Sequence, residues 1–97
     1  MNKSKLLRDV RYGTPRSISA VYESGDIENW SFYSGDGCYL MAHDFRGLNG
    51  NGERYLEDEY EDLPVTLDEI SDLIDGLLMA PDVEEIRDRW SNVDCDL

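Results

Sequence analysis

Six carboxylates and two tyrosines stand within ten residues of this chain, in the segment ERYLEDEYED at positions 53–62. Carboxylates attract Arg and Lys side chains, and aromatic rings add cation–π contacts and desolvated anchors for such side chains. The pattern is typical of a surface that binds cationic groups of another protein. We therefore predict partner-binding residues at Glu53, Tyr55, Glu57, Asp58, Glu59, Tyr60, Glu61 and Asp62. An alternative is that these charges protect the edge of a sheet from aggregation.

A second carboxylate stripe is expected on a helix over residues 67–78. At 100° per residue, Ile70, Leu73, Ile74, Leu77 and Leu78 share one side of this helix, and the other side carries Asp68, Asp72 and Asp75. Thr66 fits the N-cap position, and Glu69 three residues later completes a capping box. The helix is expected to face the core with its apolar side, so its three aspartates form a second candidate partner-binding site.

No residue set typical of catalysis or metal binding accompanies these acids. His43 is the single histidine, and Cys38 lies five residues before it, so the two would point to opposite faces of one strand. His43 is therefore interpreted as a hydrogen-bonded structural residue. Neither the glycines nor the acids fit a phosphate-binding loop or a calcium-binding EF-hand loop, and two distant cysteines do not form a zinc site. The sequence predicts no enzyme, no cofactor and no metal.

The net charge of −13 is unevenly distributed along the 97 residues. Residues 1–16 contain five Lys or Arg and one Asp and carry +4, so residues 17–97 carry −17. An acidic body repels nucleic acid and anionic membranes and attracts basic proteins. No apolar run has the length of a signal peptide or of a membrane span, so we expect a cytoplasmic protein that binds neither nucleic acid nor membrane directly.

Runs of strand-like sequence followed by helix-like sequence favour an α+β fold. We predict one domain, 1–97, with a basic segment at 1–16 that could form a short helix. An antiparallel sheet of three or four strands is expected at 17–60, two C-terminal helices packed on one face of it at 66–90, and a tail at 91–97. The second helix is expected at 82–90, because Val83, Ile86 and Trp90 would share one side of it.

The first two predicted strands flank Gly25-Asp26, a pair typical of a two-residue hairpin loop. Such a loop pairs Val21 with Trp30, and it leaves Ile18, Ala20 and Tyr22 on the other face. It also places Glu23 opposite Glu28, which is unfavourable, so the turn is either one residue longer or meets a cation. The expected core is Val21, Trp30, Phe32, Ile70, Leu73, Ile74 and Leu77.

Small size and high acidity are shared by phage anti-CRISPR and anti-restriction proteins, which gives a comparison of composition alone. The leading hypothesis is an inhibitor that mimics nucleic acid and occupies the basic nucleic-acid-binding surface of a nuclease or host-defence enzyme, in the host cytoplasm if a phage encodes it. Alternatives are a bacterial toxin-immunity protein, or a homodimeric or larger adaptor whose acidity serves solubility. In the adaptor, a sheet with two apolar faces would leave a patch that binds a second copy.

Overall fold

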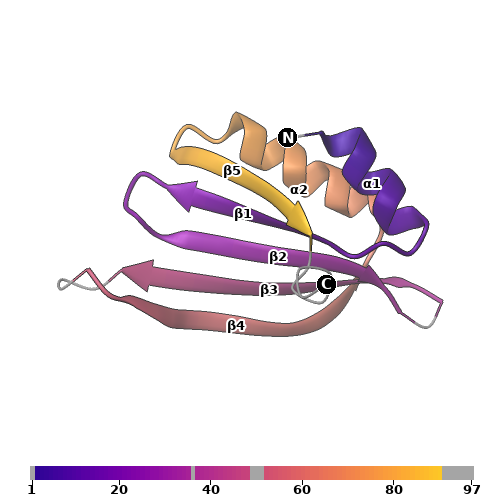
Figure 1. Cartoon of the computed structure of the whole chain (residues 1–97), viewed down its shortest axis with the longest axis horizontal. Helices are drawn as coiled ribbons and strands as arrows, with labels where there is room; N and C mark the ends of the chain where they lie inside the picture. Colours follow the sequence, from indigo (N-terminus) through magenta and orange to yellow (C-terminus); the bar gives the residue numbers. More distant parts are fainter. Residues whose placement is uncertain (1, 36, 49–51, 91–97) are drawn as a thin grey trace.

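The computed structural model describes residues 2–35, 37–48 and 52–90, without the side chains of 57, 60, 61, 89 and 90. One antiparallel sheet of five strands has the order β4-β3-β2-β1-β5, and two helices lie on one side of it (Figure 1). The elements in chain order are α1 (Lys3–Arg11), β1 (Arg16–Tyr22), β2 (Ile27–Ser34), β3 (Tyr39–Leu48), β4 (Arg54–Val65), α2 (Leu67–Met79) and β5 (Val83–Trp90).

The helix starts follow from local sequence. Asn2 caps α1 by accepting a hydrogen bond from the Lys5 amide. The capping box predicted for α2 is confirmed: Thr66 Oγ1 accepts from the Glu69 amide at 3.1 Å, and Glu69 Oε1 accepts from the Thr66 amide at 3.0 Å. Both helices therefore begin where side-chain oxygens satisfy the first free amides.

The fold prediction is wrong at residues 82–90, where Val83–Trp90 form the strand β5 and not a second C-terminal helix. β5 pairs along β1, whose other edge is taken by β2, so the sheet has five strands instead of three or four. In a strand, Ile86 and Asp88 lie on the same face, and Asp88 there forms an ion pair with Arg16 of β1. Pairing with an open sheet edge thus outweighs the weak helical periodicity of this segment. β4 also extends beyond the predicted sheet boundary, to Val65.

The hairpin between β1 and β2 has a three-residue loop, 23–25. The turn is therefore one residue longer than the two-residue loop expected at Gly25-Asp26. Tyr22 and Asp26 pair across its base, and Gly25, with φ of 91°, donates to the Tyr22 carbonyl. A type I turn followed by a glycine with positive φ is a common three-residue hairpin. The longer loop places Ile18 opposite Trp30 and Val21 opposite Ile27, which corrects the predicted register.

That register decides which face of the sheet is apolar. The helices cover the face that carries Ile18, Ala20, Trp30 and Phe32, which are buried together with Leu6 and Val10 of α1 and Ile70, Ile74 and Leu77 of α2. Val21 was predicted in this core, and that was wrong because it lies on the opposite face. Leu73 was also predicted in the core, and it is only partly buried and packs against the edge of the core.

Two ion pairs attach the basic N-terminal segment to the body. Lys3 Nζ lies 2.7 Å from Asp75 Oδ1 of α2. Arg16, whose side chain is 7 % exposed, binds Asp9 of α1 at 2.5 Å as well as Asp88 of β5. The segment therefore docks on the acidic body. Neither helix in the described ranges is long and apolar enough to cross a lipid bilayer.

Candidate functional site

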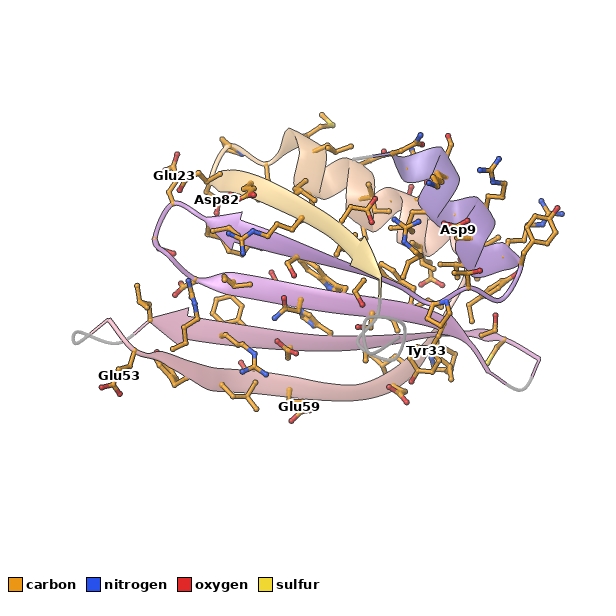
Figure 2. All side chains as sticks on the ribbon, viewed as in Figure 1. Asp9, Glu23, Tyr33, Glu53, Glu59 and Asp82 are labelled. Atoms are coloured by element: carbon orange, nitrogen blue, oxygen red, sulfur yellow. The ribbon has the colours of Figure 1, made fainter. Side chains whose placement is uncertain are left out.

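The predicted partner-binding segment 53–62 lies almost entirely on β4, the edge strand farthest from β5 and α2 (Figure 1). The carboxylates of Glu53 and Glu59 extend from this edge away from the other strands (Figure 2). Asp58 and Asp62 are also exposed. Glu57, Tyr60 and Glu61 lie on the same strand, and their side chains are outside the described part of the structure. The structure therefore brings the first predicted cluster onto one sheet edge.

Two irregularities in the pairing of β3 with β4 coincide with pairs of acidic residues. Phe45 pairs with Asp58 and Arg46 with Leu56, so Glu57 is an additional residue on β4. Between the pairs His43–Tyr60 and Met41–Leu63, β4 again has one residue more than β3, at Glu61 or Asp62. Such bulges twist an edge and interrupt its regular backbone pairing. The outer edge of β4 is thus suited to contact through side chains rather than to the addition of a further strand.

The ring of Tyr55 lies over a glycine of β3, Gly47. A Cβ atom at Gly47 would lie 2.6 Å from the Tyr55 ring, so only glycine allows the ring to lie across this part of the sheet. The ring remains 46 % exposed. It is therefore an oriented and accessible aromatic surface beside the acids, as an anchor for a cationic side chain requires.

The second predicted cluster is on α2, on the other side of the molecule (Figure 1). Asp68 and Asp72 are exposed and Asp75 is half-buried. Lys3 is bonded to Asp75, and Asp68 lines a shallow groove together with Arg8 and Arg11 of α1. Basic residues of the N-terminal segment thus offset part of this charge. Among the described residues, no salt bridge reaches Asp58 or Glu59 on β4.

The opposite face of the sheet has polar residues at its centre, which the sequence analysis did not foresee. One row of neighbouring residues crosses all five strands: Arg87, Ser19, Asn29, Asp44 and Glu59. Ser19 donates to Asn29 at 2.5 Å, and Asn29 donates in turn to Asp44 at 2.7 Å. In the next row, the hydroxyls of Ser17 and Ser31 lie 3.0 Å apart. The alternation of polar residues in β1 and β2 was the available signal, and the wrong hairpin register concealed it.

This polar face encloses a hollow of about 320 Å³. Ser19 is 3 % exposed although no helix covers this face. The hollow is lined by Ser17, Ile18, Ser19, Ile27, Asn29, Trp30, Ser31, Asp44, Arg46 and Arg87. None of these was among the predicted site residues.

His43 is hydrogen-bonded, as its structural interpretation requires. Its ring stacks on Trp30 with centroids 5.2 Å apart, and Nε2 contacts Glu28. The second carboxylate oxygen of Glu28 accepts from the Tyr22 hydroxyl at 2.5 Å. Burial raises the pKa of Tyr22 well above its ordinary value, and the hydrogen bond to Glu28 adds to the shift. Cys38 is exposed before β3, and Cys95 lies outside the described residues.

Within residues 2–35, 37–48 and 52–90, no three His, Cys, Asp or Glu side chains converge as metal ligands would. Comparison of the chain with protein-family models, with curated proteins and with solved structures gives no match. The function is therefore inferred from the surfaces described above.

Proposed function

We propose that this protein is a small acidic inhibitor that binds the basic nucleic-acid-binding surface of a nuclease or host-defence enzyme through β4. The observation that supports the proposal most is the row of acidic residues along an irregular edge strand, on the side of the molecule away from the basic N-terminal segment. The partner would contribute Lys and Arg side chains to the carboxylates and to the Tyr55 ring. The protein would act in the cytoplasm.

Twelve residues of β4 extend over about 40 Å, at roughly 3.3 Å per residue. An edge of this length can follow a groove that normally holds a nucleic-acid strand. The exposed side chains of Tyr55, Leu56 and Leu63 lie among the acids and supply apolar contact area. Carboxylates at the rim accelerate association, and desolvated aromatic groups slow dissociation.

A bacterial toxin-immunity protein would use the same acidic edge against a basic toxin, and it remains the alternative within this class. The homo-oligomeric adaptor has less support. It required a second apolar face, and the face opposite the helices combines Val21, Ile27 and Ala42 with five polar residues: Ser17, Ser19, Asn29, Ser31 and Asp44. Pairing of two β4 edges would also bring like charges together.

The test compares two variants with equal changes in net charge. One carries Asp58→Lys and Glu59→Lys on β4, and the other carries Asp68→Lys and Asp72→Lys on α2. Purified restriction-type and CRISPR-type nucleases serve as probes, with cleavage of a labelled DNA duplex and binding at several salt concentrations as readouts.

We expect the wild type to inhibit at least one of these enzymes at low salt. The β4 variant should no longer inhibit, and it should associate with the enzyme more slowly. The α2 variant should inhibit like the wild type. Tyr55→Ala should increase the dissociation rate. If both lysine variants remain folded and behave like the wild type, or if no enzyme is inhibited, the proposal is rejected. Loss of inhibition in the α2 variant alone would move the binding site to α2.

A further inference from the structure

We propose that the hollow on the polar face is a binding site for a small oxyanion, a carboxylate or a phosphate group, held between Arg46 and Arg87. This site is separate from the acidic edge of β4, and it does not depend on the function proposed there. It rests on the lining residues, their hydrogen bonds and the distribution of the arginines.

The floor of the hollow is a built hydrogen-bond network. Ser19 is 3 % exposed, and its hydroxyl donates to Asn29, which donates to Asp44. Arg46 Nε lies 3.4 Å from Asp44 Oδ1. These contacts orient the Asn29 amide and fix the side chains around it.

The groups that remain available are mainly donors. A guanidinium carries five N–H groups. Arg46 forms one ion pair, with Asp44 at 3.4 Å, and Arg87 forms one, with Glu85 at 3.3 Å. Asn29 has a second amide hydrogen, and one of the paired hydroxyls of Ser17 and Ser31 can donate to a ligand. A donor-rich hollow is complementary to an acceptor-rich group, and guanidinium groups bind carboxylate and phosphate oxygens in pairs.

The position of the two arginines supports a ligand between them. Arg46 is on β3 and Arg87 on β5, with β2 and β1 between, so their strands lie about 14 Å apart. Both side chains are about half exposed, 47 % and 51 %, and both line the same hollow. Outside residues 1–16 the chain has only four basic residues, and two of them line this hollow.

The large negative charge of the chain does not prevent such binding. Asp44 and Glu85 are each paired with one of the two arginines. The acidic residues of α2 lie beyond the other face of the sheet, and the β4 acid that shares a row with the hollow is Glu59, beside Asp44. Interactions between exposed charges are largely screened beyond about 8–10 Å at physiological ionic strength. Arg46 and Arg87 are the cationic side chains that line the hollow, and its volume of about 320 Å³ suits a small ligand.

The experiment is a titration of the ¹⁵N-labelled protein with inorganic phosphate and, separately, with citrate, followed by amide chemical shifts. Sodium chloride at matched ionic strength is the reference. Arg46→Gln and Arg87→Gln each remove one guanidinium, Ser19→Ala breaks the floor of the hollow, and Arg11→Gln removes an equal charge from α1. Both arginines are exposed enough that their variants should fold, and unchanged shifts in α2 would verify this.

We expect saturable shifts at the amides of Ser17, Ser19, Ser31 and Arg87 with at least one of the two probes. Each arginine variant should weaken this binding by about tenfold or more, as expected for loss of a charged hydrogen-bonding partner. Arg11→Gln should bind like the wild type, because Arg11 lies on α1. The probe that binds more tightly identifies the group as carboxylate or phosphate.

The proposal is overturned if phosphate and citrate shift these amides no more than sodium chloride does. It is also overturned if the arginine variants bind with wild-type affinity, or if the saturable shifts lie at Lys5, Arg8 and Arg11 on α1 instead.

Discussion

The helix-covered strands and the β3–β4 hairpin belong to one sheet, yet they differ in what lies on their faces. β1, β2 and β5 contact α1 and α2, and the nine buried apolar residues of the described chain lie on β1, β2 and the two helices. The hairpin of β3 and β4 has only marginal contact with either helix, and it carries exposed Leu48, Tyr55, Leu56 and Leu63 among acids. The buried core therefore lies under the helix-covered strands, and the β3–β4 hairpin contributes mainly exposed side chains.

The electrostatic pairs show the same contrast. In the covered part, Arg16 is buried between Asp9 and Asp88 and joins α1, β1 and β5. On β4, the carboxylates of Asp58 and Glu59 are exposed. A charge that is buried must be paired, whereas an exposed charge can remain available to a partner.

The largest effect is expected for Arg16→Ala. Removing one member of a buried ionic network leaves Asp9 and Asp88 without their shared cation and typically costs about 3–5 kcal/mol. The free energy of unfolding, from chemical denaturation at pH 7, measures this effect. Lys3→Ala is the matched control, because the Lys3–Asp75 pair also attaches α1 but is partly exposed, at 32 % and 50 %, and should contribute about 1 kcal/mol or less. Equal effects of the two changes would contradict the assigned burial of Arg16.

A pair of apolar truncations should sharpen the comparison of the two parts. Ile74→Ala removes a fully buried side chain and should lower the free energy of unfolding by about 2–5 kcal/mol. Leu63→Ala, at a residue 50 % exposed on β4, should lower it by less than about 1 kcal/mol. Denaturation midpoints measured under the same conditions check this. If Leu63→Ala were as destabilising as Ile74→Ala, the hairpin would have its own core, and the division would be wrong.

The smallest effect concerns two tyrosines at alkaline pH. Burial and the hydrogen bond to Glu28 raise the pKa of Tyr22, and the hydrogen bond to Asp62 raises the pKa of Tyr33 to about 12. A raised pKa means that the folded state favours the neutral phenol, so this contribution is complete below pH 10, the ordinary tyrosine value, and is lost as the pH rises above it. For Tyr33 the loss occurs between pH 10 and about 12.

Tyr22→Phe and Tyr33→Phe should each reduce the loss of stability above pH 10, and Tyr22→Phe should have the larger effect because the pKa of Tyr22 is raised further, by burial first and by the hydrogen bond to Glu28 second. Denaturation midpoints at a series of pH values from 8 to about 11 measure this. Tyr12→Phe, at a residue 76 % exposed, is the control and should leave the pH dependence unchanged. Identical profiles for all three variants would show that neither hydrogen bond influences stability.

The sequence by itself determined the elements that depend on local chemistry. Thr66 and Glu69 define the start of α2 because their side chains satisfy amides within the same turn. The apolar side of α2 follows from a period of 3.6 residues, and Ile70, Ile74 and Leu77 are buried as that period predicts. The concentration of acids at 53–62 is visible in the sequence, and the structure places it on one strand.

The tertiary structure decided what depends on pairing between distant segments. Whether 83–90 is a helix or a strand depends on the open edge of β1, which no local pattern reveals. One residue more in the 23–25 loop changed the register of β1 with β2 and, because side chains alternate between faces, moved Ile18 into the core and Val21 out of it. The same change brought Ser17, Ser19, Asn29 and Ser31 together on the open face. The polar hollow therefore arises from strand register, which local sequence specifies only weakly.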